Sequence, residues 1–584
     1  MIENGHLVAA GGRINLASVA STGEVIPSPY DLKVTSVKKG TINIVHSFML
    51  PGEMPPARDG EMPSPDGMLP PDGMIPPDGM IPPEGMLPPD GMIPHEGMLS
   101  PEGITGQEKL ANIDTNGHGG GQIFIRADQF FLDRGTIFAD NIGGIDDGGI
   151  DINIQRDMHL TNSARITAGA MYNLEEEERG GNISIQTGKL DISGVGINQL
   201  DSYVDLLLYW TESSPEYFEQ FDMNKIEAQN FVSSLQTVII GLLEQGEIFS
   251  LNTIVNQMDK QYKITISKVL APILNTIATS TFGVGNSGEV SINTPLLNIN
   301  SGVIQANTEN SGNAGDIEIK AQDISLNYGF IAATTTTSGN AGDITIQGFN
   351  QPKANRISVT NNSSIIASSV GMGDAGEINI KTHDLVLKEG GFINSFSYYN
   401  TGKAGEIEIE ANTVEIANEG SGIYTEADNA SGGDITLNVS NRLELLDDSK
   451  ISAASIGDKS LDEGGNITIE KPEMFIIKNS KLSTEGYRGD GGNINFDFSK
   501  LELSGDNEIK SSSSKWGSPG ELWLNKVKLT DGFILPSPKI EVADLSLDRC
   551  VGITKENLSR FVITIRDVLP SEPGDLQNHL YISE

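Results

Sequence analysis

The sequence is short of cysteine, aromatic residues, positive charge and long apolar runs. Its single cysteine, Cys550, excludes an internal disulfide framework and a cluster of cysteine zinc ligands. Aromatic residues make up only 6% of its 584 residues. Lys and Arg number 39 against 79 Asp and Glu, so the formal net charge is −40. A chain this acidic repels phosphate backbones, so we expect no nucleic-acid partner.

No apolar stretch is long enough to cross a bilayer. The densest stretches, near "VDLLLYW" and "VIIGLL", fall far short of the roughly 20 apolar residues of a membrane helix. The opening residues, "MIENGHLVAAGG", lack the basic start and the unbroken apolar core of a signal peptide. We therefore expect neither a membrane span nor a signal peptide in this sequence.

Glycine is abundant, with 66 residues, and much of it belongs to an internal repeat. The pattern Gly-(Asp/Glu/Asn)-Ile-x-Ile recurs mostly every 27 to 29 residues in the second half of the chain. Copies begin at Gly121, Gly181, Gly288, Gly315, Gly342, Gly376, Gly405, Gly433, Gly465, Gly492 and Gly520, and a shifted copy lies at 150–154, which makes twelve. A fixed period of this length indicates a solenoid.

Within each copy, apolar residues alternate with polar ones, which is the period of a β-strand. The copy at Gly315 contains three such runs, with apolar pairs at Ile317/Ile319, Ile324/Leu326 and Ile331/Ala333. In the third run a large residue precedes a small one by two positions, as in Ile304/Ala306, Ile366/Ser368 and Ile423/Thr425. The recurring Gly suits a corner with positive φ, and the acids beside it suit turns. Three short strands per repeat predict an all-β, right-handed parallel β-helix of about twelve three-strand coils.

Two segments interrupt the repeat and divide the chain. Residues 51–107 contain a Pro/Gly/Met hexapeptide, as in "MIPPDGMIPPEG", which is typical of an extended low-complexity linker. Residues 197–280 place apolar residues three and four apart, which predicts a helical insertion; examples are Val269, Leu270, Ile273, Leu274 and Ile277. The remaining segments are β-helix coils at 108–196 and 281–535, a β region at 1–50, and a C-terminal cap and tail at 536–584.

The sequence contains no recognisable catalytic or cofactor-binding motif, so we predict no enzyme and no cofactor. One acidic cluster, Asp146, Asp147 and Asp151, is a candidate calcium site because carboxylates are ligands that calcium prefers. Two groups are candidate binding residues. They are the insertion aromatics Trp210, Tyr217 and Phe218, and the tripeptide Arg488, Gly489 and Asp490, a sequence that integrins recognise on exposed loops.

Three stretches together resemble the filamentous-haemagglutinin-like exoproteins of bacterial two-partner secretion. The repeat words "SGNAGDITI" and "GFIAATT" are similar to the shaft of that family. "GHLVAAGGRINLASVASTGEV" resembles the closing part of its N-terminal secretion domain, and "DRCVGITKENLSRFVITIRDVLPSEP" resembles a Cys-containing C-terminal segment. The family's secretion domain is longer and carries an Asn-Pro-Asn-Gly-type motif that this chain lacks. The resemblance therefore implies a truncated or split member, with residues 1–50 as the remnant of the secretion domain.

The resemblance implies a non-catalytic adhesin shaft, extracellular or on the bacterial cell surface. Its partners would be glycans or surface proteins of a host or neighbouring cell. The full-length family also uses an outer-membrane transporter. Two alternatives stay open: a lyase or hydrolase acting on polysaccharides, since such enzymes also use parallel β-helices, and a structural surface-layer filament.

Overall fold

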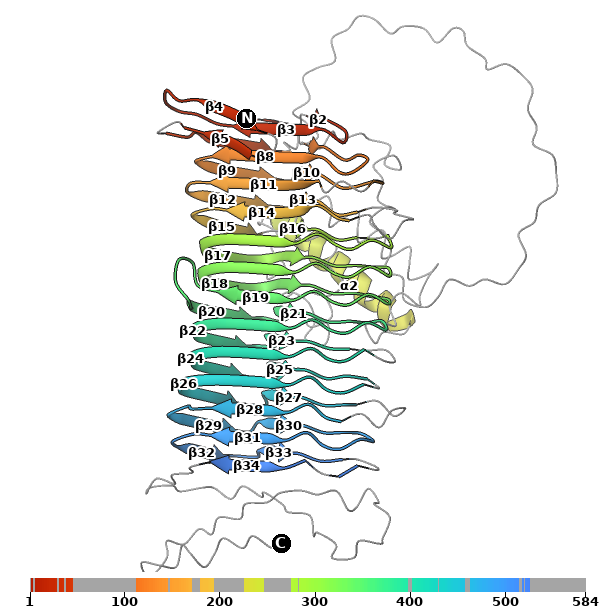
Figure 1. Ribbon diagram of the computed structural model, residues 1–584, viewed down its shortest axis with the longest axis vertical. Helices are drawn as coiled ribbons and strands as arrows, with labels where there is room; N and C mark the ends of the chain where they lie inside the picture. Colours follow the sequence, from red (N-terminus) through yellow and green to blue (C-terminus); the bar gives the residue numbers. More distant parts are fainter. Residues whose placement is uncertain are drawn as a thin grey trace, which may run out of the picture.

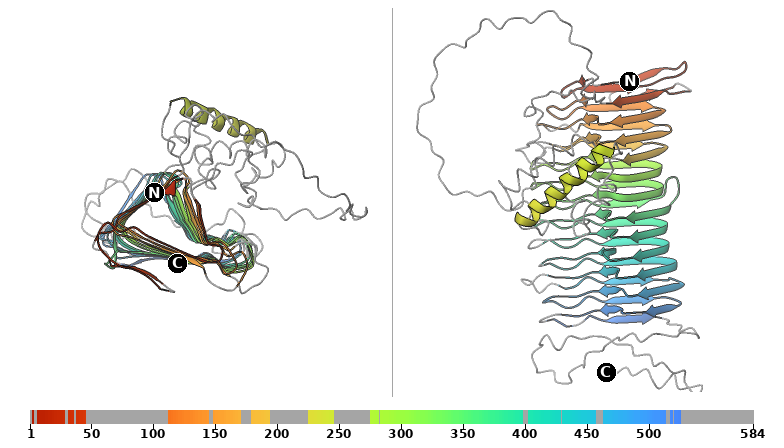
Figure 2. Two further views of the ribbon diagram at one scale, coloured as in Figure 1. Left: turned by 90° about the horizontal axis from the view of Figure 1, so that it is seen from above. Right: turned by 180° about the vertical axis from the view of Figure 1, so that it is seen from behind.

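The computed structural model describes fifteen stretches of the chain. They are residues 2–3, 6–28, 31–35, 38–45, 112–144, 148–170, 179–193, 225–245, 275–281, 283–397, 402–428, 430–456, 463–513, 517–518 and 520–525. Within them the protein is nearly all β, with one helix, α2 (Lys225–Gln245). The parallel strands stack as a solenoid with a triangular cross-section (Figures 1 and 2). The predicted fold class is therefore confirmed, whereas the right-handed winding stays a prediction.

Each coil contributes a strand to each of three faces. The first face contains β3 (Arg13–Ala17), β8 (Gln122–Ala127), β11 (Gly149–Ile154), β14 (Asn182–Gln186), β19 (Ile344–Gln347), β28 (Ile467–Glu470), β31 (Ile494–Asp497) and β34 (Leu522–Asn525). The second contains β1 (Ile2–Glu3), β6 (Thr41–Val45), β9 (Gln129–Asp133), β12 (Asp157–Thr161), β15 (Lys189–Ser193), β20 (Ala354–Thr360), β29 (Met474–Lys478) and β32 (Leu501–Ser504).

The third face contains β2 (His6–Val8), β7 (Asn112–Asp114), β10 (Thr136–Phe138), β13 (Arg165–Thr167), β16 (Asn275–Ala278), β21 (Ser364–Ile366), β23 (Phe392–Asn394), β25 (Gly422–Tyr424), β27 (Lys450–Ser452), β30 (Lys481–Ser483) and β33 (Glu508–Lys510). Longer strands bend around corners: β17 (Val290–Gln305) and β18 (Ile317–Ala332) follow all three faces, and β22 (Ile378–Lys388), β24 (Ile407–Ala417) and β26 (Ile435–Leu446) follow two. All twelve predicted first strands are present, and about eleven coils are complete.

Aliphatic ladders fill the interior, because parallel pairing in register places like residues over like. Ile317, Ile344 and Ile378 are paired neighbours on the first face, and all are at most 1% exposed. Among the described residues, the predicted inward positions are confirmed with one exception, which lies on the third face. There Ile365 and Ala367 face the core, and Ile366 is only half-buried, so the predicted pair Ile366/Ser368 is wrong by one residue. Because Ile365 and Ile366 are adjacent isoleucines, the sequence does not show which of them faces the core. The pairing with the preceding coil decides it, since Ile365 pairs with the buried Ile331.

Close backbone approach, not positive φ, explains the recurring glycine. A Cβ on Gly342 would lie 2.0 Å from the carbonyl oxygen of Gly315, one coil earlier, and Gly376 stands in the same relation to Gly342. Neither glycine has positive φ. Left-handed residues lie instead at the corner between the second and third faces, where many are Asn or Asp, such as Asn361, Asn418 and Asp447. The expectation of positive φ at the first-strand glycine is therefore wrong.

Both long interruptions leave the solenoid at the corner between the second and third faces. Residues 46–111 join β6 to β7, and residues 194–274 join β15 to β16. Because β3 pairs with β8 and β6 pairs with β9, the N-terminal strands continue the same solenoid. The Met-Pro segment is thus an insertion within one coil.

The helical insertion is shorter at its C-terminal end than predicted. Ile277 lies in β16, where it is buried and pairs with Ile166 and Ile304, so its assignment to an amphipathic helix is wrong. An apolar residue three or four positions after another fits a helix, but the same residue also fits the alternation of a strand. Helix α2 lies beside the stacked coils in both views of Figure 2. Within residues 225–238, where burial is described, its buried side chains are those of Ala228, Phe231, Val232 and Leu235.

No helix in the described ranges has the length and apolar character of a membrane crossing.

Cleavage inside residues 70–80, at an engineered protease site, is expected to leave the two fragments associated. The pairings β2 with β7, β3 with β8 and β6 with β9 all join strands on opposite sides of the cut. Size-exclusion chromatography followed by denaturing electrophoresis checks this result. Separate elution of the fragments in native buffer would contradict it.

Candidate functional site

Of the predicted calcium ligands, only Asp151 lies in the described residues, and its carboxylate is already occupied. Arg126 donates from Nη1 to Oδ1 and from Nη2 to Oδ2 of Asp151, both at 2.9 Å. Such a bidentate pair uses the carboxylate as an anion partner for arginine. Asp146 and Asp147 lie outside the described residues. Asp151 is therefore a structural residue in this fold.

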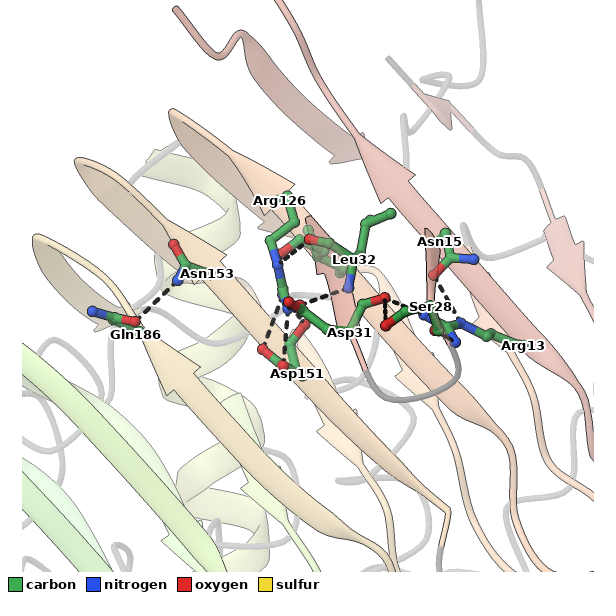
Figure 3. A network of polar contacts seen from close by, with 10 residues as sticks. Arg13, Asn15, Ser28, Asp31, Leu32, Arg126, Asp151, Asn153 and Gln186 are labelled. Carbon is green, nitrogen blue, oxygen red and sulfur yellow. Dashed lines mark hydrogen bonds and ion pairs between the residues drawn. The ribbon is translucent and has the colours of Figure 1, made fainter. Parts of the chain in front are cut away.

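Arg126 also fastens a β-hairpin, formed by β4 (Val25–Ser28) and β5 (Asp31–Val34), to the first face (Figure 3). Its guanidinium donates to Asp31 Oδ1 at 2.9 Å and to the carbonyl of Leu32 at 3.0 Å, and its side chain is only 7% exposed. The side chain of Leu32 is buried beneath the hairpin. The hydrogen bond from Arg126 is the main reason that the pKa of Asp31 lies below its ordinary value. As the pH falls through this lowered pKa, protonation of Asp31 removes its ion pair with Arg126 and weakens the hairpin contact.

Arg13 holds the same hairpin from the other side. It donates to the main-chain carbonyls of Ser28 and Asp31, the latter at 2.8 Å. Its guanidinium carbon lies 4.1 Å from the centre of the Phe124 ring. Phe124 is an outward residue of β8, yet it is buried. The hairpin, held by Arg13 of β3 and Arg126 of β8, thus covers the first face at the N-terminal end.

The tripeptide Arg488, Gly489 and Asp490 lies in the loop between the third and first faces. Gly489 is buried, and a Cβ on Gly517 in the next coil would lie 2.1 Å from its carbonyl oxygen. The exposed Asp490 accepts a hydrogen bond from the main-chain N–H of Ser518 at 2.6 Å. The loop is thus built into the stack, and the acid of the tripeptide holds the following coil. The predicted binding residues Trp210, Tyr217 and Phe218 lie outside the described residues.

Most outward Asp and Asn residues beside the repeat glycines support the coil that follows. Asp316 Oδ1 accepts the N–H of Asp343, and Asp343 Oδ1 accepts that of Glu377, both at 2.8 Å. Asn182, Asp434, Asn466 and Asn493 make the same bond further along the column. A parallel column uses Asn286, Asn313, Asn340 and Asp374. These bonds give a structural reason for the polar residue after the repeat glycine.

Stacking acids in one column has an electrostatic cost. The pKa of Glu377 is raised, first because the side chain is partly buried and then because the carboxylates of Asp343, Glu406 and Glu408 lie nearby. Six successive coils carry an acid at this position: Glu289, Asp316, Asp343, Glu377, Glu406 and Asp434. The column concentrates negative charge along the first face.

A group of different ionisable side chains, which the sequence analysis did not predict, lies on the second face. His159 Nδ1 lies 3.3 Å from Asp191 Oδ2, and Lys189 Nζ lies 2.6 Å from the same oxygen. Asn298 Nδ2 donates to Asp191 Oδ1 at 2.7 Å, and the His159 ring stacks on Phe131 with ring centres 4.9 Å apart. Alignment of the outward positions of consecutive coils is the signal that would have found this group. A carboxylate that orients an imidazole is also the arrangement of a general base.

Asp140 is a buried carboxyl group whose pKa is strongly raised. It is 2% exposed, and burial raises its pKa from the ordinary 3.8 to about 6. Its oxygens accept hydrogen bonds from Thr167 Oγ1 at 2.8 Å and from the N–H of Gly169 at 2.7 Å, which offset part of that cost. The group lies at the end of the third face and contacts no candidate binding residue in these bonds.

Asp140→Asn is expected to stabilise the protein at pH 7.5 but not at pH 4. Because the folded pKa is raised, the favourable contribution of the protonated acid is complete below 3.8 and is lost as the pH rises through about 6. The difference corresponds to at most about 3 kcal/mol. Thermal unfolding of both proteins at the two pH values measures it. An equal gain at both pH values would contradict a titrating Asp140.

Among the described residues, no group of three or more His, Cys, Asp and Glu side chains is arranged to hold a metal ion. Comparison with known proteins found no matching family model, no matching curated protein and no matching solved structure.

Proposed function

We propose that the chain is a non-catalytic adhesin shaft that acts outside the cell or on the bacterial surface. The observation that supports this proposal is that the outward acids accept hydrogen bonds from the backbone of the next coil. Asp316, Asp343 and their equivalents cap the backbone of the next coil, so the polar surface builds length by repeating one pattern. Such a surface suits a spacer that presents a binding segment. The family resemblance adds an outer-membrane transporter as the export partner.

The proposal assigns binding to the residues that interrupt the pattern at 194–274. Replacing residues 197–272 by a short Gly-Ser loop keeps β15 and β16 and is expected to preserve the β-sheet circular dichroism. Binding to glycan arrays or to cells is expected to fall at least tenfold. The matched control replaces residues 51–103, which leave the solenoid at the same corner, and is expected to bind normally. Unchanged binding by the first variant would refute the assignment.

A polysaccharide-acting enzyme is a second candidate, favoured by the His159 and Asp191 pair. Incubation with acidic polysaccharides, followed by detection of unsaturated or reducing ends, separates the two candidates. The adhesin proposal expects no product. Product that disappears in the His159→Asn variant would favour the enzyme and place its site on the second face.

A further inference from the structure

At the two ends of the described solenoid, apolar residues of the core are only partly buried. Nearly all the half-buried apolar residues that pack against the core lie in the outermost strands. They are Ile2, Leu7, Ile14 and Leu16 at one end and Leu501, Ile509 and Leu522 at the other, while Ile42 lies in β6, one strand further in. One coil further in, the residues paired with Ile2, Leu7 and Ile14 are fully buried. Both ends thus present apolar surface of the same triangular outline.

The ends also stop at the same phase of the coil. At the N-terminal end the outermost strands are β1 on the second face, β2 on the third and β3 on the first. At the other end they are β32, β33 and β34, on the same three faces in the same order. In the described ranges each of these strands has a paired neighbour on one side only. The cap and tail predicted at 536–584 lie outside the described ranges. Within those ranges, each end of the solenoid has the strand edge that the other end lacks.

From this match we propose that the chain binds a second copy of itself head to tail, with the last coil of one copy pairing in parallel with the first coil of the next. In the register of the existing ladders, Leu522 faces Ile14, Ile509 faces Leu7 and Leu503 faces Ile2. Glu521 then lies opposite Arg13, so the pairing also joins opposite charges. This inference does not depend on the proposed adhesin function.

The edge of β3 is open to such pairing. The carbonyl of Gly12 accepts the N–H of Gln122, and the N–H of Ser18 donates to the carbonyl of Arg126. A parallel ladder uses alternate residues, so the main-chain groups of Arg13, Asn15 and Ala17 point to the open side. Strands β1, β2 and β3 contain neither Pro nor Lys, the residues that commonly block an edge. A contact between unlike ends does not close on itself, so it generates a filament.

Analytical ultracentrifugation and electron microscopy of the full chain test the proposal. We expect the mass to rise with concentration and the rods to join end to end. The axial repeat should be about 60 Å, because thirteen described strands are stacked on each face at a spacing of about 4.8 Å. Asn15→Pro removes an N–H on the open side and is expected to weaken association at least tenfold without changing circular dichroism or melting. The matched control, Asn15→Thr, keeps that N–H and should associate like the parent. Leu7→Lys is a second blocking variant at the same end.

Mixing the parent with the Asn15→Pro variant distinguishes unlike ends from like ends. The variant keeps its C-terminal edge, so it should add to one end of a parent filament and shorten the filaments. No shortening would overturn the head-to-tail arrangement. A full chain that stays monomeric at all concentrations, rods that join only side by side, or a variant that associates as the parent does would each overturn the proposal.

Discussion

Ile344→Asp is expected to destabilise the solenoid by about 5 kcal/mol, on the order of the cost of an unpaired buried charge. Ile344 is fully buried in β19, between Ile317 and Ile378 of the neighbouring coils. Those neighbours are aliphatic and offer no donor to a carboxylate. Urea unfolding followed by circular dichroism measures the loss.

The matched control is Gln347→Asp in the same strand. Gln347 lies on the outward side, between the positions of Lys320 and Lys381 in the adjacent coils. Gln347 donates from Nε2 to Glu318 at 3.3 Å, so an acid there loses that hydrogen bond and meets one carboxylate, but it also meets two lysines and water. We therefore expect a loss of at most about 1 kcal/mol. If both variants unfold at the same urea concentration, the division into inward and outward residues is wrong.

Gly342→Asn is expected to cost more than about 4 kcal/mol or to abolish cooperative unfolding. Its Cβ would lie 2.0 Å from the carbonyl oxygen and 2.5 Å from the carbonyl carbon of Gly315. Both contacts are backbone atoms of a paired coil, so the clash is relieved only by separating the two coils. The same close approach recurs at Gly376 and Gly405, and the thermal unfolding midpoint reports the effect.

Gly420→Asn provides the control, because Gly420 needs conformational freedom and not space. Its φ is +81°, and the nearest atom to an added Cβ is 3.4 Å away. Asparagine adopts the left-handed region more readily than other side chains, so we expect a loss below about 1 kcal/mol. A control as damaging as Gly342→Asn would show that φ, and not close approach, determines the glycine positions.

The N-terminal hairpin shows that a sequence pattern does not reveal contacts between residues far apart in the chain. Asp151 sits at an outward position, where the alternation of the strand places it correctly. Its partner Arg126 and the hairpin residue Asp31 are 95 residues apart in sequence. Composition and spacing carry no information on such a contact, so the sequence predicts a calcium ligand where the structure has a partner of Arg126. The His159 and Asp191 pair escaped prediction for a different reason. Its members face each other in register on the adjacent strands β12 and β15, and only an alignment of the outward positions of successive coils brings them together in the sequence.

The sequence by itself determined the parallel β-solenoid, its coil period and nearly every buried residue, because alternation and repetition are local properties that each coil expresses separately. The tertiary structure decided what depends on the stacking of coils. It placed Ile365 and not Ile366 in the core, because pairing with Ile331 selects the register. It assigned the repeat glycines to close backbone contact and the acids to capping, since both roles require the position of the neighbouring coil. It also joined residues 2–45 to the solenoid, because hydrogen bonding between coils reaches across an insertion of any length.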